Sequence, residues 1–551
     1  MSAVLSEFAH LIGAVISGGY IVWSIVERVS LKYINRDLTP FAAYSSLWIA
    51  VVLVPFFIYI RNRLYYLRGS RMHDCKPAKV YPHRDPILGL DMLFIMLKAV
   101  REHKVLSIWY SLFHSIGSTY WTLTTGKWVL MTCEPENIKA LLSTQFESWP
   151  LSPIRKKGLE EVLGPHAIFT VDGPEWQHAR AMIRPSFVRR QITDLEYMDR
   201  HVENFLDRLP KDSSKFDIQE LLYLFTMDVS TDFMFGHSTN MLTNPSKEAL
   251  EFTNSFDYML YAAATRGRLG WLLLLMPDKR FRECIKVCNS FIDRYVADAI
   301  TQDKEKERSY VFMYELIQSG ASPRMVRDQL MALILGGRDT SASTMTSLFW
   351  ILARRPDVVK KLRNEISDLN GRKPTCEELK TLKYLNMVLK EGITMSHFPQ
   401  FCFPRNMLTC IVALRLWPPL PSNMRTSNKD IVLPKGGGLD GQSPVFVPKG
   451  TDCRFSTYSL HRRKDLYGED AEEFRPERWE SLRPSWEYIP FSGGPRICIG
   501  QQFALTQMLY LIARVLQHFD QIKPADNNPM LQKAGTTISM VKGCWIYLTP
   551  P

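Results

Sequence analysis

Apolar residues recur at helical spacing along much of the chain. The clearest segments with this period are 193–209, 216–236, 281–302, 324–353, 356–369 and 500–518. Two shorter regions, near 119–133 and 429–455, are β-like and are bounded by turn residues. The pattern therefore predicts a mainly α-helical domain with small β-sheets.

Two long apolar stretches lie near the N-terminus, at about 8–26 and 41–60. The second lacks charge and is long enough to cross a bilayer at ~1.5 Å per residue. It is followed by a stop-transfer run of basic residues, namely Arg61, Arg63, Arg68, Arg71, Lys76 and Lys79. This run argues against a buried helix and favours a cytosolic location for everything downstream. We expect a membrane anchor over 1–60, with one or two transmembrane helices.

Polar residues and prolines follow this anchor. Residues 61–85 include Pro77 and Pro82 and suit a linker to a catalytic domain over 86–551. The chain of 551 residues has a net charge of +12 and ten scattered cysteines, which form no compact disulfide framework. No zinc-finger spacing or RNA-binding signature occurs, so the positive charge favours a membrane or an acidic partner protein over nucleic acid.

The strongest chemical signal is the loop Phe491-Ser-Gly-Gly-Pro-Arg-Ile-Cys498-Ile-Gly500, which precedes a helix. A haem-thiolate site needs a cysteine that is held close to the iron and kept ionised. Gly494 and Gly500 permit a close approach and positive φ angles. A helix beginning at about Gly500 directs N–H groups and its dipole at the sulfur, which favours the anion. The alternative is a Gly-Pro turn with an incidental cysteine.

This loop resembles the cysteine-loop signature of cytochromes P450, matching Phe491, Gly494, Arg496, Cys498 and Gly500. The resemblance covers roughly 85–550, and it implies the cytochrome P450 fold. It also implies haem b (iron protoporphyrin IX) as the cofactor, Cys498 as the ligand of its iron and Arg496 as the partner of a haem propionate.

A second motif lies on the apolar helix predicted over 324–353. Two mid-helix glycines, Gly336 and Gly337, cost about 1 kcal/mol each relative to alanine, so we expect them to have a purpose. The resemblance implies that they let the helix bulge over the haem to admit O2. It also implies that Thr340 hydrogen-bonds the bound dioxygen or a water, and that Asp339 relays protons. The alternative is a kinked core helix.

Two further motifs match the same family. Trp176-Gln-His-Ala-Arg180 has the i,i+4 spacing that puts both side chains on one helical face, where the family holds a propionate. Phe474-Arg-Pro-Glu-Arg478-Trp matches the segment whose arginine, Arg478, joins a buried Glu–Arg pair.

The chain departs from the family at that pair. The family has Glu-x-x-Arg on one helical turn, whereas here Glu391 and Arg415 are separated by 392–412. Removing 392–412 restores Lys-Glu-Ala-Leu-Arg. We interpret the stretch as an insertion, and our hypothesis is an intron read through in frame. A tolerated surface loop is the alternative, because a loop could bulge out and let Glu391 meet Arg415.

The segment 433–450 resembles the glycine-rich loop of fungal alkane and fatty-acid hydroxylases. The resemblance implies an enzyme of the endoplasmic reticulum membrane whose catalytic domain faces the cytosol. It would insert one oxygen atom from O2 into an apolar substrate, with electrons from NADPH-cytochrome P450 reductase. Fatty acids or alkanes are the first expectation, and terpenoids, steroids, polycyclic aromatics or other xenobiotics remain open.

Two other functions stay open at this point. One is a haem-thiolate isomerase that needs no reductase, against which the Asp339-Thr340 pair argues. The other is a catalytically impaired haem-binding membrane protein, which the insertion at 392–412 makes conceivable.

Overall fold

The computed structural model describes residues 57, 60–188, 195–269, 278–301, 312–390 and 414–550. The apolar stretch 8–26, all of 41–60 except residues 57 and 60, and Glu391 with 392–412 lie outside the described residues.

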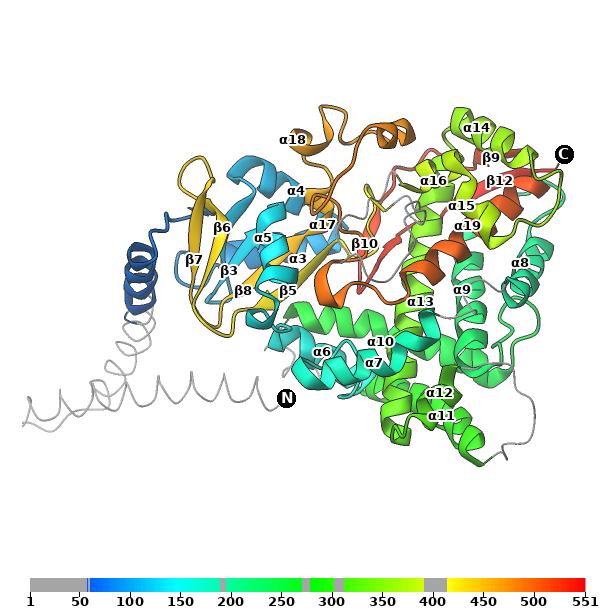
Figure 1. The fold of residues 1–551 in the computed structure, drawn as a ribbon, viewed down its shortest axis with the longest axis horizontal. Coiled ribbons are helices and arrows are strands. Elements are labelled where there is room, and N and C mark those ends of the chain that lie inside the picture. Colours follow the sequence, from blue (N-terminus) through cyan, green and yellow to red (C-terminus); the bar gives the residue numbers. More distant parts are fainter. Residues whose placement is uncertain are drawn as a thin grey trace, which may run out of the picture.

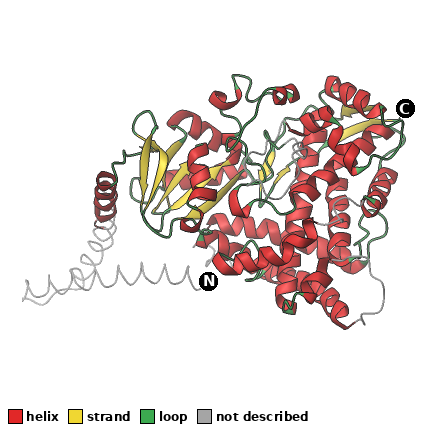
Figure 2. Ribbon diagram, viewed as in Figure 1, coloured by secondary structure: helices red, strands yellow, loops and turns green. Residues whose placement is uncertain are grey.

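Helices make up most of the described chain, as the helical period predicts (Figure 2). The longer helices are α3 (Leu90–Arg101), α4 (Val105–Ile116), α6 (Pro153–Leu163), α7 (Gly173–Val188), α8 (Glu196–Arg208), α9 (Ile218–Phe235), α10 (Lys247–Leu269), α11 (Lys279–Thr301), α13 (Pro323–Leu352), α14 (Pro356–Ser367) and α19 (Gln501–His518). Short helices are α5 (Pro135–Lys139), α12 (Phe312–Gln318), α15 (Cys376–Thr381), α16 (Lys383–Lys390), α17 (Thr457–Leu460) and α18 (Lys464–Tyr467). Tighter or wider turns form η1 (Ala140–Thr144), η2 (Phe146–Ser148), η5 (Pro476–Glu480) and η6 (Gly494–Arg496).

The strands form small sheets, again as predicted. The largest has the order β1-β2-β3-β8-β5, formed by Lys79–Val80, Thr119–Thr124, Lys127–Thr132, Asp452–Ser456 and Ser422–Thr426. Beside it lies the hairpin of β6 (Ile431–Gly437) and β7 (Ser443–Val447). Two further sheets join β4 (Phe216–Asp217), β12 (Trp545–Thr549) and β9 (Gln521–Pro524), and β10 (Gln532–Ala534) with β11 (Ile538–Met540). Figure 1 shows the largest sheet and the β6–β7 hairpin on one side of the molecule and most of the helices on the other.

The turn between β2 and β3 illustrates how local sequence sets the register. Thr125 and Gly126 connect the two strands, and both have positive φ, at +51° and +80°. A two-residue hairpin turn with both central residues in this region matches the twist of antiparallel strands. The register that results pairs Thr119 with Thr132.

The helix α13 runs through the middle of the helical side (Figure 1). Ser322 caps its first turn by accepting a hydrogen bond from the N–H of Met325 at 3.3 Å, and Pro323 occupies the first helical position. Most of its residues are buried, and it packs along α9. Gly336, Asp339 and Thr340 all lie on this helix, which therefore fixes their positions relative to one another.

The region predicted as a linker, 61–85, is partly folded. A helix covers 60–72, and Lys79 and Val80 form β1 at the edge of the largest sheet. Among the described residues, no helix combines the length and apolar character needed to cross a membrane.

Candidate functional site

Backbone hydrogen bonds close the loop that carries Cys498. The N–H of Cys498 donates to the carbonyl of Phe491, and that of Ile497 donates to the carbonyl of Gly494, both at 3.0 Å. Gly494 has a φ of +66°, and a Cβ at this position would overlap the carbonyl oxygen of Leu142 in η1. Glycine is therefore required at position 494 both by conformation and by space.

Among the described cysteines, Cys498 alone has an exposed side chain, although its sulfur lies deep in the protein and is surrounded by protein atoms. The N–H of Gly500, the residue that precedes α19, donates toward its sulfur, as the sequence predicts. Even so, burial raises the pKa of the Cys498 thiol to about 11, against the lowering effects of the Gly500 N–H and of the positive charge on Arg180. The predicted N–H group that favours the anion is thus present, and burial of the sulfur opposes it. A coordinated metal ion deprotonates a thiol outright, so ionisation would accompany iron binding.

The two motifs that the family associates with a propionate come together beside this loop. Two guanidinium groups lie near the ring of Trp176, with the carbon of Arg496 at 4.6 Å and that of Arg180 at 5.9 Å from the ring centroid. Arg496 donates to the carboxylate of Asp172 at 2.6 Å and to the carbonyl of Val171 at 2.8 Å. The face of α7 that carries Trp176 and Arg180 therefore lies against Arg496 of the cysteine loop.

Two further arginines in this cluster have no motif in the sequence. Arg425, on β5, is 3% exposed, and its Nε has no hydrogen-bond partner among the described residues. Burial, and then the positive charges of Arg155 and Arg496, lower the pKa of Arg425 to about 9. Burial also lowers the pKa of Arg155 and of Arg496 to about 10, and the charge of Asp172 opposes this in each of the three arginines. Three crowded cations therefore share one carboxylate.

The second motif lies on α13, where the run of buried residues is interrupted. Gly336, Gly337 and Thr340 are half-buried, whereas their neighbours on the helix are buried. The hydroxyl of Thr340 donates to the carbonyl of Gly336 at 2.6 Å. The ring of Phe169 lies 3.7 Å from the position that a Cβ on Gly336 would take. Ser230 of α9 lies still closer to the corresponding position on Gly337.

The helix α13 is assigned without a break over Pro323–Leu352, and the bulge expected at Gly336 and Gly337 stays a prediction. The side chain of Thr340 binds a carbonyl one turn earlier, which is how threonine is commonly accommodated inside a helix. Gly337 also allows close packing, since a Cβ there would stand 2.9 Å from the hydroxyl of Ser230.

Asp339 is buried on the same helix beside its neighbour Arg338. The Nη1 of Arg338 lies 3.1 Å from Oδ1 of Asp339, and the same guanidinium also binds Asp257 of α10. Burial raises the pKa of Asp339 to about 6, with the nearby charge of Asp257 adding to the rise and Arg338 opposing it. Asp339 can therefore change protonation state near neutral pH.

Arg415 and Arg478, the two arginines that the motifs assign to a buried Glu–Arg pair, share a hydrogen-bond acceptor, the carbonyl of Glu473. Arg415 is completely buried and donates to backbone carbonyls, including that of Glu473 at 3.0 Å. Arg478 donates to Oδ1 of Asp470 at 3.1 Å and to the same Glu473 carbonyl at 3.4 Å. Their predicted carboxylate partner, Glu391, lies outside the described residues.

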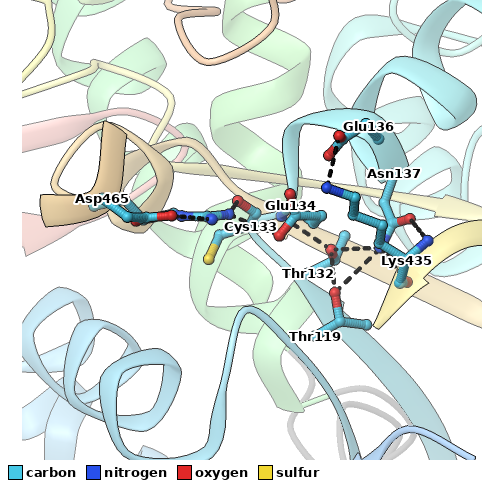
Figure 3. Close-up of polar contacts among 9 residues, drawn as sticks. Thr119, Thr132, Cys133, Glu134, Glu136, Asn137, Lys435 and Asp465 are labelled. Atoms are coloured by element: carbon cyan, nitrogen blue, oxygen red, sulfur yellow. Dashed lines mark hydrogen bonds and ion pairs between the residues drawn. The ribbon is translucent and has the colours of Figure 1, made fainter. Parts of the chain in front are cut away.

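A polar network holds α5 against β2, β3 and β6 (Figure 3). The amide nitrogen of Asn137 in α5 donates to the hydroxyls of Thr119 and Thr132, which pair across β2 and β3. Lys435 of β6 binds Glu136 at 2.8 Å, and its carbonyl accepts from Asn137. This network fixes α5, which continues directly into η1, the turn against which Gly494 packs.

Glu134 and Asp465, both labelled in Figure 3, form ion pairs with the same arginine, Arg463, at 2.8 Å for Glu134 and 2.6 Å for Asp465. Cavities of about 330 and 370 Å³ adjoin this arginine, and both are lined by it and by Asp465. Neither is lined by Cys498 or by α13. Their charged walls suit a structural role better than the binding of an apolar substrate.

The arginine cluster fits the cofactor that the family resemblance implies. Haem b carries two propionate carboxylates, and buried guanidinium groups are stable when paired with such anions. The Nε of Arg425 has no partner among the described residues, and Arg155 and Arg496 share the negative charge of Asp172. A further anion would therefore stabilise this cluster. Cys498 provides the soft ligand that a haem iron accepts.

Comparisons with known proteins agree with this geometry. The sequence model described as "Cytochrome P450" matches residues 86–412 and 413–543. The chain is 36% identical to cytochrome P450 monooxygenase himC of Aspergillus japonicus, over 96% of this chain and 93% of that protein. It is 34% identical to cytochrome P450 52A5 of Candida maltosa, over 91% of this chain and 97% of that protein. It is 37% identical to cytochrome P450 monooxygenase FPY7 of Fusarium mangiferae, over 86% and 90%.

The cysteine loop, the arginine cluster and these matches together lead to one conclusion: the chain belongs to the cytochrome P450 family, and it is a monooxygenase that uses haem b, dioxygen, a redox partner and an organic substrate.

Proposed function

We propose that Cys498 binds the haem iron from one side and that α13 covers the opposite face. The observation that carries this proposal is the position of Cys498. Its side chain is the only exposed one among the described cysteines, it receives the Gly500 N–H, and it is close enough to Arg180 for the two charges to interact. Phe491 and Gly494 shape the loop that presents it.

The haem propionates would bind the arginines around Trp176. Arg180 and Arg496 lie near its ring, and Arg425 offers an unpartnered Nε from β5. Arg155 adds a fourth positive charge, which lies near Asp172. Because these groups come from separate elements, binding of the propionates would tie α6, α7, β5 and the cysteine loop together.

Bound at this site, haem supplies an iron centre that activates dioxygen with two electrons and two protons, so that one oxygen atom enters the substrate. The protein contributes the path of those protons. Asp339 holds or releases a proton at its carboxyl group, because its pKa is about 6. Thr340 directs its own proton to Gly336 and can accept a hydrogen bond at its oxygen.

The substrate would be an apolar molecule that reaches the half-buried face of α13. Phe169 lies over Gly336 and gives this space an aromatic wall. Its loop is fixed to α13, since the N–H of Ile168 donates to the side chain of Gln329 at 3.0 Å. We favour fatty acids or alkanes, because of the glycine-rich β6–β7 hairpin, and terpenoids, steroids or polycyclic aromatics are the alternatives.

The membrane and the electron donor belong to the same proposal. Large apolar side chains are exposed over the first part of the described chain, namely Phe57, Leu64, Tyr65, Met72, Val80, Ile87, Leu88, Leu90, Phe94 and Leu97. An apolar surface of this kind suits contact with a bilayer. We propose an enzyme that is anchored in the endoplasmic reticulum membrane by 1–60, faces the cytosol and accepts electrons from NADPH-cytochrome P450 reductase.

We also propose that 392–412 is an insertion. The match to the family's sequence model is divided between residues 412 and 413, which is the C-terminal border of this stretch. If the insertion prevents Glu391 from reaching Arg415, the loss of a buried ion pair would cost ~3–5 kcal/mol. A catalytically impaired haem protein is then the second candidate function. Sequencing the mature transcript tests the intron hypothesis, which uniform presence of codons 392–412 would refute.

The test of the catalytic proposal uses the full chain in yeast microsomes with NADPH-cytochrome P450 reductase. We expect NADPH and O2 consumption that depends on an added fatty acid or alkane and that yields hydroxylated product. Conversion of the substrate to an isomer without reductase, and without consumption of NADPH or O2, would instead support an isomerase. Haem-loaded protein that consumes neither NADPH nor O2 would support the impaired form.

Phe169→Ala tests the position of the substrate. We expect it to raise the dissociation constant measured from the substrate-induced Soret shift up to about tenfold, since an aromatic contact is worth about 0.5–1.5 kcal/mol beyond the area that it buries. Trp545→Ala is the matched control, because Trp545 is an aromatic residue of β12 that is 39% exposed and lies outside the surface proposed to contact the membrane. Equal affinities in Phe169→Ala and the parent would place the substrate elsewhere.

A further inference from the structure

One cation is shared by two carboxylates on different helices. Adjacent residues on a helix normally point apart, yet Nη1 of Arg338 lies 3.1 Å from Oδ1 of its neighbour Asp339. The same guanidinium forms a two-pronged contact with Asp257 of α10, in which Nη1 binds Oδ1 and Nη2 binds Oδ2 at 3.2 Å. Asp257 is 81 residues away in the sequence and belongs to none of the family motifs found in it.

The three groups differ strongly in exposure. The side chain of Arg338 is 2% exposed and that of Asp339 is 9% exposed, whereas that of Asp257 is 53% exposed. The guanidinium is also packed against aromatic rings, at 5.0 Å from the centroid of Tyr223 and 5.7 Å from that of Phe256. Arg338 therefore cannot leave its site easily, and Asp257 is the solvent-facing end of the cluster.

The charges that face Asp339 come from three helices. Arg338 belongs to α13 and attracts the ionised carboxylate. Asp257 belongs to α10 and repels it. Tyr223 belongs to α9 and remains neutral, because burial, and then the charge of Asp339, raise the pKa of its hydroxyl. Asp257 thus acts on Asp339 in two ways. It repels the ionised form, and it accepts two hydrogen bonds from Arg338, whereas Asp339 accepts one.

We propose that Asp257 is a positioning residue for Asp339. By holding the shared guanidinium from α10, it prevents a closed one-to-one ion pair between Arg338 and Asp339, and so keeps the Asp339 carboxyl free to take up and release a proton. The step is a proton transfer alone, in which an O–H bond forms at Asp339 and breaks as the proton passes on. This inference rests on the proposed role of Asp339 in proton delivery and extends it to a residue on α10.

The consequence of losing Asp257 follows from the geometry. In Asp257→Asn the second carboxylate is gone, so Arg338 would turn both nitrogens toward Asp339. A bidentate, buried ion pair strongly favours the ionised carboxylate. A nearby opposite charge typically lowers the pKa of an aspartate by about 1–3 units. Asp257→Glu retains the charge and should restore part of the parent behaviour.

The first experiment measures Asp339 directly and does not depend on turnover. The protonated-carboxyl band of the purified, haem-loaded full chain is followed by infrared spectroscopy against pH, and the band that disappears in Asp339→Asn is assigned to Asp339. We expect its midpoint to fall by at least about 1 pH unit in Asp257→Asn. Glu251→Gln is the matched control, because it removes an exposed carboxylate from the same helix, and it should leave the midpoint unchanged. An unshifted midpoint in Asp257→Asn would overturn the proposal.

The second experiment measures proton delivery in the reconstituted enzyme with reductase. Asp257→Asn should release more hydrogen peroxide per NADPH and show a larger solvent isotope effect, while the substrate-induced Soret shift and the carbon monoxide spectrum stay as in the parent. A purely structural role for Asp257 would weaken substrate binding and leave peroxide yield and isotope effect unchanged, which would refute the positioning role. A parent that binds haem but forms no oxygenated product would refute the proposed function, and the infrared midpoint would still decide whether Asp257 controls Asp339.

Discussion

The hydroxyl of Thr340 donates to the carbonyl oxygen of Gly336, 2.6 Å away and one helical turn earlier. The bond uses the only proton of the hydroxyl and leaves its oxygen able to accept another. Both residues lie where the buried surface of α13 is interrupted. Thr340 is therefore oriented before any ligand binds, and it presents an acceptor on the face proposed to cover the haem.

Replacing Thr340 by alanine tests this orientation. We expect Thr340→Ala to lower product formed per NADPH at least about tenfold, because a positioned proton-transfer group contributes 10²–10⁴-fold. Thr340→Ser is the control, since it keeps the hydroxyl, and it should retain most of the coupling. The measurement is product and peroxide yield at equal haem content. Equal coupling in all three proteins would remove Thr340 from the proton path.

Asp339 should make stability depend on pH in a predictable direction. Its pKa of about 6 in the folded state exceeds the ordinary 3.8, so the folded state binds the proton more tightly than the unfolded state. The favourable contribution is complete below pH ~4, declines as pH rises to ~6, and is lost above that. Asp339→Asn removes this dependence.

We therefore expect Asp339→Asn to gain stability relative to the parent as pH increases. The difference in unfolding free energy should grow by about 1 kcal/mol between pH 5 and pH 8. Thermal unfolding of the purified proteins at several pH values measures it. A stability difference that is the same at every pH would contradict an elevated pKa for Asp339. A difference that shrinks as pH rises would mean that folding lowers this pKa.

Arg425 should be needed to retain haem. We expect Arg425→Ala to lose haem roughly tenfold faster to an apomyoglobin acceptor, because one charge-assisted hydrogen bond to a propionate is worth about 1.5–3 kcal/mol. Arg425→Lys should recover only part of this, since lysine lacks the planar fork. Arg101→Ala, an exposed arginine on α3, is the control. Unchanged haem loss in Arg425→Ala would show that the propionates bind elsewhere.

Gly494 should tolerate no side chain. Gly494→Ala puts a Cβ into the carbonyl oxygen of Leu142 at a φ of +66°, so the cysteine loop cannot close. We expect folded protein with little haem, or none at all. Gly158→Ala, on the open side of α6, meets no atom within 4 Å and should be neutral or slightly stabilising. Haem content per folded protein measures both, and normal haem content in Gly494→Ala would disprove this packing.

The parts of the site that were predictable depend on short-range spacing. Trp176 and Arg180 share a helical face because they are four residues apart, and Cys498 precedes a helix because Gly500 can begin one. Arg425 was not predictable, because it reaches the cluster through the pairing of β5 with β8. The contact of Asp257 with Arg338 depends in the same way on how α10 packs, which no local pattern encodes.

Packing and burial add what the motifs could not give at two places. On α13, Gly337 allows a close approach to Ser230 of α9, whereas Gly336 lies against Phe169. The Cys498 thiol receives the predicted N–H of Gly500, but burial outweighs this and raises its pKa. Sequence motifs identify which groups meet, whereas the balance between burial and hydrogen bonding follows only from the three-dimensional arrangement.

The most direct test of the central claim is the carbon monoxide difference spectrum of the reduced protein in yeast microsomes. It is recorded for the full chain, for a chain lacking 392–412, and for Cys498→Ser. We predict a thiolate-type Soret band from the full chain, from the shortened chain, or from both, and none from Cys498→Ser. Folded, haem-loaded protein without that band in both the full and the shortened chain, or an unchanged band in Cys498→Ser, would contradict Cys498 as the iron ligand.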